Sequence, residues 1–453
     1  MSRVAIIGEN SIEYIEKLLE IWNAGDCAVL IDRKTPLGTA HEMIMEAAVH
    51  KCYIEEHIFK KCENYLPTNI ELSPFKCTTH SATVLKKEIY EKYRDNYSSN
   101  EALVIYSSGT TGKSKGIILS HYAISTNANA IIDYMKPNCN DCIYIVKSLT
   151  HSSTLIGELL VGLKSNAKLI VAPTIVPPRH IVGNVKEKKA TILCLNPMLL
   201  SLISEYVIQN KCQFSFLKKI YVSGSILSDK TYERAHYAFK NIPIYNAYGL
   251  SEAGPRVAVQ RDDCCKNNSV GKPIKGVELI LVDKQGSPVK KGSCGIIHIN
   301  TKSQFLGYIS GNEKHKSLYH GWLNSGDVGY IDERDELHIV DRVDDVIVIN
   351  SHKIYPSDIE NQILANLPFN DCAVVPFKNG NRCYIGCLYT TNIEVKDIRR
   401  QLMNVLLPYE IPEVFFRSDF MPRTINGKIS KNNIQKILQK EVRGRIKDGN
   451  YKR

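Results

Sequence analysis

The chain has 453 residues, of which 43% are hydrophobic and 23% are charged, so it can bury a large core. This composition excludes a mainly disordered chain and a disulfide-stapled miniprotein, and at roughly 150 residues per domain it predicts two to four domains. The formal net charge of +11 is spread along the sequence instead of forming a basic stripe. We therefore expect a solvated surface and no nucleic-acid partner, with weak polyanion binding as the alternative.

The sequence contains no run of about 18 apolar residues, so no membrane-spanning helix is expected. The opening MSRVAIIGEN lacks the long apolar stretch of a secretion signal, and we expect a cytoplasmic protein. The 14 cysteines show no spacing typical of a disulfide framework. The C-x-x-C motif at Cys139 and Cys142 has no second ligand pair, so buried, reduced thiols are favoured over a zinc site.

The first 31 residues predict a strand, a helix and a second strand. The strands are Val4–Ile7 and Cys27–Ile31, and the helix is Ile12–Trp22, which follows the good N-cap Ser11 and ends before Gly25. Similar alternation continues to about residue 250. Further strands are expected at Ala102–Tyr106, Ile143–Val146, Lys168–Val171, Thr191–Leu195 and Lys219–Val222. This pattern predicts a layered α/β core with parallel strands.

After about residue 270 the pattern changes. Short strands such as Val277–Val282 and Gly295–Ile299 are separated by glycine and charged turns, which predicts a smaller β-rich unit. From about residue 340 a compact α+β segment is expected. Its helices are predicted at Pro356–Leu367 and Val395–Leu406, and its strands at Ala373–Phe377 and Cys383–Tyr389.

The most informative stretch is YSSGTTGKSKGIILSH at Tyr106–His121. Its first part, Ser107–Gly116, contains only Ser, Thr, Gly and Lys, so backbone N–H groups and hydroxyls can surround a phosphate chain. A Walker P-loop needs four residues between its glycines, whereas two threonines separate Gly109 from Gly112. The following Gly116–Leu119 predicts a strand instead of the helix that a Walker loop begins. A phosphate-binding loop of another kind is therefore expected.

This loop resembles the phosphate-binding signature of the adenylate-forming enzymes, which include acyl-CoA synthetases, adenylation domains of nonribosomal peptide synthesis and beetle luciferases. Five later segments resemble signatures of the same family, in the family's order. They are NAYGLSE at Asn246–Glu252, SGDVGY at Ser325–Tyr330, DRVDDVIVINSHKIYPSDIE at Asp341–Glu360, LPYEIP at Leu407–Pro412 and PRTINGKISK at Pro422–Lys431. The resemblance implies an α/β fold with a large N-terminal portion, residues 1–341, of layered α/β subdomains and a small β-rich unit. It also implies a mobile α+β C-terminal lid, residues 342–453.

The resemblance also implies roles for individual residues, although each alone has an ordinary structural explanation. Lys428 would neutralise charge that develops between the substrate carboxylate and the α-phosphate. Ser251 would bond the α-phosphate, and Glu252 would help to hold Mg²⁺, a hard cation that prefers oxygen ligands. The other nucleotide-binding residues implied are Ser107, Ser108, Gly109, Thr110, Thr111, Gly112 and Lys115 at the phosphates, Tyr248 stacked on adenine, Asp327 and Arg342 at the ribose, and Asn246 and Gly249 as further contacts.

An acyl pocket is implied in the same way. Its residues would be His151, which is also implied in catalysis, with Ser152, Ser223, Gly224, Ala247 and Arg256. Relatives that activate amino acids usually have Asp where Ser152 stands, and a neutral hydroxyl cannot balance an α-ammonium in a desolvated pocket. We therefore expect an aliphatic or aryl carboxylic acid as the substrate. His151 alone would more often be a core or capping residue, and only the resemblance favours a role in the pocket. Arg256 either meets a polar group in the pocket or lies on the surface.

Together these features predict a ligase that uses ATP and Mg²⁺ to form an acyl-adenylate and then transfers the acyl group to a pantetheine thiol. The lid is expected to pivot at Asp344 between the two steps. The thiol belongs to coenzyme A or to an acyl or peptidyl carrier protein. The choice between these acceptors stays open, because Asn350 and Ser351 replace a Gly-rich pair that lines the pantetheine tunnel in many relatives. A non-catalytic nucleotide-binding module is the other alternative, and the presence of the implied lysine and both carboxylates disfavours it.

Overall fold

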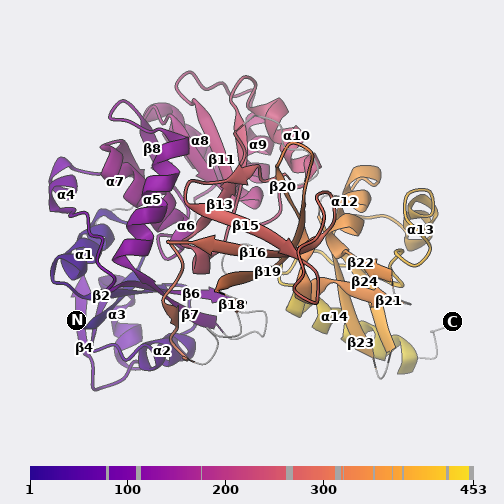
Figure 1. Ribbon diagram of the computed structural model, residues 1–453, viewed down its shortest axis with the longest axis horizontal. Coiled ribbons are helices and arrows are strands. Elements are labelled where there is room, and N and C mark those ends of the chain that lie inside the picture. The colour runs from indigo at the N-terminus through magenta and orange to yellow at the C-terminus, as the bar shows by residue number, and fades with distance from the viewer. Residues whose placement is uncertain are drawn as a thin grey trace.

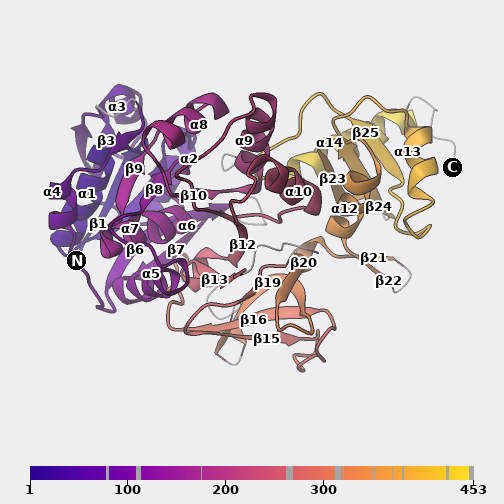
Figure 2. The ribbon, with the colours of Figure 1, turned by 90° about the horizontal axis from the view of Figure 1, so that it is seen from above.

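The structure is a computed structural model that describes residues 1–77, 81–108, 114–174, 176–261, 269–311, 318–319, 321–349, 352–369, 371–379, 382–424 and 428–447. Figure 1 shows the first strand and the C-terminal part of the described chain on opposite sides of the molecule. Figure 2 separates three parts: the α/β portion, the β-rich unit below it, and the C-terminal part beyond both. In the part of the chain that the structure describes, no helix combines the length and apolarity needed to cross a membrane.

The first sheet has the strand order β17-β7-β6-β2-β1-β3-β4. Its strands are β1 Arg3–Gly8, β2 Cys27–Asp32, β3 Lys51–Glu55, β4 Glu71–Phe75, β6 Glu101–Ser108, β7 Ser114–Ser120 and β17 Gly307–Tyr308, accompanied by helices α1 Ile12–Asn23, α2 Leu37–Glu46, α3 Glu56–Glu63 and α5 His121–Met135. Helix α1 begins where predicted, because the Ser11 side chain accepts a hydrogen bond from Tyr14 N. It packs on the sheet through a buried face that includes Ile15 and Leu18.

The second sheet has the order β14-β13-β12-β11-β10-β8-β9-β5. Its strands are β5 Thr83–Val84, β8 Cys142–Ile145, β9 Lys168–Val171, β10 Ile192–Leu195, β11 Lys219–Ser223, β12 Ile244–Gly249, β13 Arg256–Val259 and β14 Lys272–Pro273. The accompanying helices are α4 Lys87–Lys92, α6 Ser152–Thr154, the π-helix η1 Leu155–Leu160, α7 Val161–Ser165, α8 Pro178–Glu187, α9 Pro197–Gln209, α10 Asp229–Ala238 and the 3-10 helix η2 Ser251–Ala253.

The sequence pattern predicts parallel strands, but the two sheets are only partly parallel. Strands β8 to β12 are parallel, but β12 pairs antiparallel with β13, and β6 pairs antiparallel with β7. The reason is the length of the connection: residues 250–255 between β12 and β13 are too few for the crossover of a dozen or more residues that a parallel pair needs. Both departures lie beside predicted site residues.

The β-rich unit is confirmed as an antiparallel sheet, in which β20 also pairs with β19. It contains β15 Val277–Val282, β16 Gly295–Thr301, β18 Leu318–Tyr319, β19 Trp322–Ile331 and β20 Leu337–Arg342. The C-terminal part contains the 3-10 helix η3 Val343–Asp345, β21 Ile347–Ile349, β22 His352–Ile354, α12 Pro356–Asn366, β23 Cys372–Asn379, β24 Arg382–Tyr389, α13 Val395–Leu402, β25 Val414–Arg417 and α14 Lys431–Lys447. The predicted α/β fold class is confirmed.

Helix α13 is shorter than predicted, because it ends at Leu402 and not at Leu406. The next residues form a tighter turn, in which Val405 N donates to Leu402 O at 3.1 Å. The two hydrophobic cores of the C-terminal part contain no described residue before Ile347. The predicted domain boundary after residue 341 and the mobility of the lid stay predictions.

Candidate active site

A carboxylate, a phenol and a guanidinium from three strands meet in the structure. Asp327 on β19 accepts a hydrogen bond from Arg342 Nη1 at 2.9 Å on one oxygen and from the Tyr248 hydroxyl on the other. Gly326 makes room for this arrangement: its φ is +71°, and a Cβ there would lie 2.9 Å from Arg342 Nη2. Burial raises the pKa of Asp327, and the Arg342 charge opposes that shift. The result is a fixed acceptor whose orientation suits a sugar diol.

Lys428, from the C-terminal part, reaches the same place. It lies beside the antiparallel bridge between Arg423 and Ile429, and its carbonyl accepts from Thr424 N at 2.7 Å. Although part of Lys428 keeps contact with solvent, loss of hydration lowers its pKa, while the carboxylates of Asp327 and Glu252 raise it. The lysine therefore lies within electrostatic reach of both acidic residues that the resemblance assigned to the nucleotide and its metal.

Two serines that lie 99 positions apart in the sequence form a direct hydrogen bond. The hydroxyl oxygens of Ser152, at the start of α6, and Ser251, in η2, are 2.9 Å apart. His151 directly precedes α6, and its carbonyl accepts from Leu155 N at 2.9 Å. The predicted α-phosphate residue and the predicted pocket residue are therefore neighbours, and both are neutral.

Glu252 is held by a residue that sequence reasoning missed. Its Oε1 accepts from the Tyr308 hydroxyl at 2.9 Å, and Lys115 Nζ lies 5.4 Å from the centre of the Tyr308 ring. Tyr308 is on β17, opposite Ile117 of β7, so it joins the phosphate-loop hairpin to Glu252. Nothing in the spacing of the sequence marks this tyrosine. An oriented carboxylate next to the hairpin that carries the predicted phosphate loop fits the oxygen donors that Mg²⁺ prefers.

The hairpin that carries the predicted phosphate loop is formed by β6 and β7. Ser107 is the register partner of Lys115, and Ser108 that of Ser114. The strand predicted at Gly116–Leu119 is confirmed as part of β7. The predicted contacts Gly109, Thr110, Thr111 and Gly112 lie outside the described residues. The structure thus places both ends of the loop.

The remaining predicted residues cluster at the carboxyl ends of β11 and β12. Ser223 and Ala247 are buried register partners, and Gly224 follows with φ +106°. Asn246 is buried, and its side-chain amide donates to Ser269 O at 2.9 Å, so it also supports the segment after β13. Gly249 is required by packing, because a Cβ there would lie 1.9 Å from the Pro255 carbonyl oxygen. Ligands of parallel α/β sheets bind at such carboxyl ends.

Arg256 is buried, so the alternative of a surface arginine is wrong. It begins β13 and is 4% exposed. Its backbone exchanges two hydrogen bonds with the Asn127 side chain, at 3.0 Å to Oδ1 and 2.9 Å from Nδ2. The backbone of Arg256 is therefore fixed against α5.

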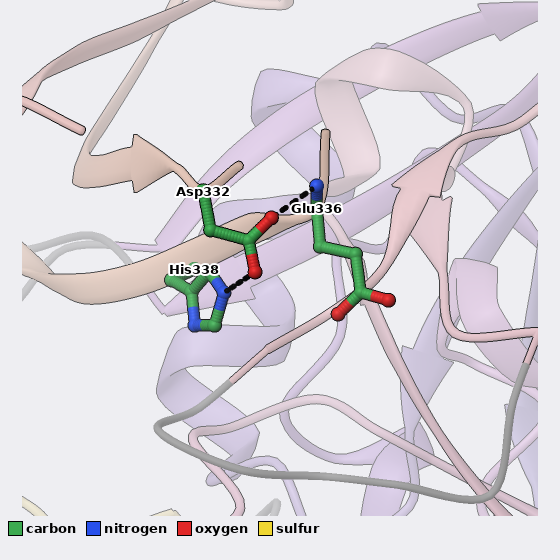
Figure 3. Close-up of side chains that lie close together, drawn as sticks. All are labelled: Asp332, Glu336 and His338. Carbon is green, nitrogen blue, oxygen red and sulfur yellow. Dashed lines mark hydrogen bonds and ion pairs between the residues drawn. The ribbon is translucent and has the colours of Figure 1, made fainter. Parts of the chain in front are cut away.

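A separate cluster of possible metal ligands lies on the turn between β19 and β20, where Figure 3 shows Asp332, Glu336 and His338 close together. Asp332 accepts from Glu336 N at 2.9 Å and contacts His338 Nε2 at 3.1 Å. The Glu336 carboxylate accepts from the Ser269 hydroxyl at 2.8 Å. These bonds stabilise the turn, and the cluster contains none of the predicted site residues.

Comparison with known proteins assigns the chain to a family. The profile described as AMP-binding enzyme matches residues 1–309, about two thirds of the sequence. The chain belongs to this AMP-binding enzyme family. It is 25% identical to a 4-coumarate–CoA ligase from Vanilla planifolia, with 98% of this chain and 84% of the relative covered. It is 24% identical to a 2-succinylbenzoate–CoA ligase from Enterococcus faecalis, with 95% and 87% covered.

The fold of the chain is also similar to that of solved structures. ATP-bound MatB from Rhodopseudomonas palustris superposes with a TM-score of 0.87 at 20% identity, covering 97% of this chain and 89% of that one. The O-succinylbenzoate coenzyme A synthetase of Bacillus subtilis, in complex with ATP and magnesium ion, gives 0.81 at 18% identity, covering 95% and 88%. The C-terminal part that carries Lys428 is therefore part of the shared fold.

Proposed function

We propose that this AMP-binding enzyme is an AMP-forming ligase that joins a carboxylic acid to the thiol of coenzyme A. The observation that carries the proposal is the convergence of Lys428, from the C-terminal part, on Asp327 and Glu252, from the N-terminal part. A cation within electrostatic reach of groups suited to ribose and phosphate is what an adenylation reaction needs. The names of the relatives, which are CoA ligases, support the same reaction class.

In the first step, a substrate carboxylate oxygen attacks the α-phosphorus of ATP, and the bond to the bridging oxygen breaks, so pyrophosphate leaves with the electron pair. We assign the ribose hydroxyls to Asp327, which Arg342 orients, and adenine stacking to Tyr248. Ser251 donates to the α-phosphate, and Lys428 stabilises the charge that develops between carboxylate and phosphate. Glu252, oriented by its bonded tyrosine, would hold Mg²⁺, whose charge favours pyrophosphate departure.

In the second step, the thiol attacks the acyl carbon of the adenylate, AMP leaves, and the thiol proton is lost to solvent. We propose that the lid, residues 342–453, turns about Asp344 between the steps. This residue is exposed in η3, directly after β20 ends at Arg342. Asn350 and Ser351, which bear on the choice of thiol, lie outside the described residues. A carrier-protein pantetheine therefore stays the alternative acceptor in the test below.

The acid is proposed to be an ordinary carboxylic acid and not an α-amino acid. The support is the Ser152 hydroxyl, which is buried and bonded to Ser251 where an amino-acid-activating relative would present a carboxylate. A neutral oxygen compensates an ammonium poorly in a desolvated site. The implied role of His151 at the floor of the pocket stays part of this proposal, since His151 directly precedes Ser152.

A cytoplasmic location is also proposed. Eleven described cysteines are free thiols, and Cys27, Cys52, Cys62, Cys142, Cys194, Cys372 and Cys387 among them are buried. Burial raises the pKa of Cys142 to about 11, so its thiol stays protonated and unreactive. Buried reduced thiols are typical of proteins in a reducing compartment.

The direct test is to incubate the enzyme with Mg·ATP, coenzyme A and separate panels of aliphatic, aryl and amino acids, and to measure pyrophosphate, AMP and thioester. Stoichiometric formation of all three with an aliphatic or aryl acid is expected. Pyrophosphate release without thioester would direct the acceptor test to carrier-protein pantetheine. Bound ATP with no pyrophosphate from any acid would contradict the proposal in favour of a nucleotide-binding module.

A further inference from the structure

A buried polar cluster lies behind the Ser152–Ser251 pair. Glu158, in η1, is 1% exposed, and Lys147 Nζ lies 3.0 Å from its Oε1. Arg256 is the second buried cation, and it acts electrostatically on Glu158 and on Tyr134 of α5. The charges of Glu158, Lys147 and Arg256 also act on the pKa of Cys194, which is on β10. Polar groups from four elements, η1, α5, β10 and β13, therefore lie in one interior region.

The polar atoms of this cluster are poorly compensated by the protein. Among the described residues, Arg256 Nε, the Tyr134 hydroxyl and both Glu158 oxygens are buried without a hydrogen-bond partner. The Lys147–Glu158 contact is an ion pair outside hydrogen-bond geometry. An uncompensated buried polar group costs roughly 1–3 kcal/mol. Glu158 Oε1 has its ion pair with Lys147, so Arg256 Nε, the Tyr134 hydroxyl and Glu158 Oε2 are the atoms that call for an explanation.

The geometry connects Arg256 to the pocket. Gly157 belongs to η1, and a Cβ at this position would lie 3.5 Å from Arg256 Nη2, so the guanidinium lies beside this turn of η1. Gly157 follows Ser152 by five residues in the continuous helical segment formed by α6 and η1. The guanidinium therefore lies beside the same segment whose start carries one hydroxyl of the pair at which the reacting carboxylate is proposed to bind.

The charges identify the group that would fit there. Lys147 and Arg256 carry two positive charges against one carboxylate, that of Glu158, so the cluster has an excess positive charge. An arginine fork binds a carboxylate through two parallel N–H donors. A hydroxyl or carbonyl could accept one of these hydrogen bonds but would leave the excess charge uncompensated.

We propose that Arg256 binds a second carboxylate of the substrate, and that the enzyme prefers dicarboxylic acids. This inference rests on the proposed ligase function and names the substrate class for it. The reacting carboxylate lies at the Ser152–Ser251 pair, and the distal carboxylate pairs with the Arg256 guanidinium beside Gly157. The Tyr134 hydroxyl supplies a further donor.

Burial raises the pKa of Glu158 to about 7, against the opposing charges of Lys147 and Arg256. Near neutral pH a large fraction of Glu158 is therefore protonated and can donate a hydrogen bond to an incoming carboxylate. Cys194, which interacts with Glu158, and Tyr134, which interacts with Arg256 and Cys194, have pKa values raised to about 12, so they stay neutral. Burial also raises the pKa of Tyr221, which interacts with Tyr134, Cys194 and Arg256.

The test compares glutarate, adipate, pimelate and suberate with monocarboxylates of the same chain length, by pyrophosphate release. For the wild type, we expect kcat/KM for the best dicarboxylate to exceed that for its matched monocarboxylate by at least about 10²-fold. Arg256→Met should bring this ratio close to one, because the dicarboxylate loses its partner for the second carboxylate. Arg179→Met, which removes an exposed arginine on α8, is the matched control and should keep the wild-type ratio.

Thermal-shift titration with each acid, with and without ATP, provides a readout independent of turnover. The melting temperature of the wild type should rise with the dicarboxylate and not with the monocarboxylate, and Arg256→Met should lose the shift. If Arg256→Met does not fold, Arg256→Lys replaces it, and we expect a reduced ratio because the fork is lost. A wild type that uses monocarboxylates equally well, or a ratio that survives Arg256→Met or Arg256→Lys, would overturn the inference. If no acid releases pyrophosphate, the proposed function fails, and the thermal shift alone decides the subsite.

Discussion

Replacing Lys428 with alanine separates the two half-reactions. In the structure its ammonium lies among Asp327, Glu252 and Arg342, with the two carboxylates favouring its charge and burial opposing it. At an effective dielectric constant of about 20, two unit charges about 4 Å apart interact by about 4 kcal/mol. Removing one donor aimed at developing charge costs about 10²–10³-fold in rate, or about 3–4 kcal/mol. We expect Lys428→Ala to lower adenylation by this factor.

The assay measures each half-reaction by itself. Pyrophosphate release reports adenylation, and conversion of supplied acyl-adenylate with coenzyme A to thioester reports transfer, which should stay near the wild-type rate. Lys436→Ala is the matched control, because this lysine is exposed on α14 and has no assigned role. Equal losses in both half-reactions of Lys428→Ala would show that the lysine is structural and would refute the reasoning.

The same lysine predicts a pH dependence. Since burial holds the pKa of Lys428 below its ordinary value of 10.5, the charged form is present below the lowered pKa and is lost as the pH rises through it. Adenylation should therefore decline on the alkaline side. Lys428→Arg, whose guanidinium does not deprotonate in this range, should move that decline to higher pH. An unchanged alkaline profile would contradict the role of the ammonium.

Three further predictions follow from other elements. Asp344→Pro should keep adenylation within about tenfold but reduce thioester formation by orders of magnitude, because proline fixes φ at the proposed pivot; equal losses would exclude that pivot. Tyr308→Phe removes the 2.9 Å bond to Glu252 and should raise KM for Mg·ATP by about 10–10²-fold with an unchanged melting temperature, measured by titration at fixed acid. Burial raises the pKa of Glu158 from 4.5 to about 7. Its contribution to stability is therefore complete below its pKa in the unfolded chain and is lost as the pH rises through its pKa in the folded protein. The melting temperature of Glu158→Gln minus that of the wild type should therefore be larger above pH 7 than at about pH 5. A difference that stays constant across this range would argue against the shift in pKa.

Local signals explain what the sequence predicted well. Ser11 before an amphipathic run and Gly25 after it located helix α1 to within one residue. The apolar Gly116–Leu119 identified the strand after the phosphate loop, which separated this loop from a Walker motif. Ordered motifs also indicated which residues meet: Asp327 and Arg342 are register partners on adjacent strands. Signals of this kind depend on a few neighbouring residues, so they can be interpreted without knowledge of the tertiary structure.

Contacts between distant segments were not predictable in the same way. Tyr308 contacts Glu252 across 56 positions, and only the pairing of β17 with β7 brings them together. The burial of Arg256 depends on Asn127 of α5, so a surface position could not be excluded from the sequence. Glu158 was not singled out from the sequence, because its environment is created by two cations, Lys147 and Arg256, that lie outside its own helix.

The most direct measurement of the central claim is the identity of the products of ATP cleavage, followed by phosphorus NMR with acid, Mg²⁺ and coenzyme A. The proposed function predicts AMP and pyrophosphate in equal amounts, appearing only when a carboxylic acid is present, together with one thioester per AMP. Formation of ADP and phosphate, or ATP that stays intact with every acid while binding is demonstrated, would contradict it.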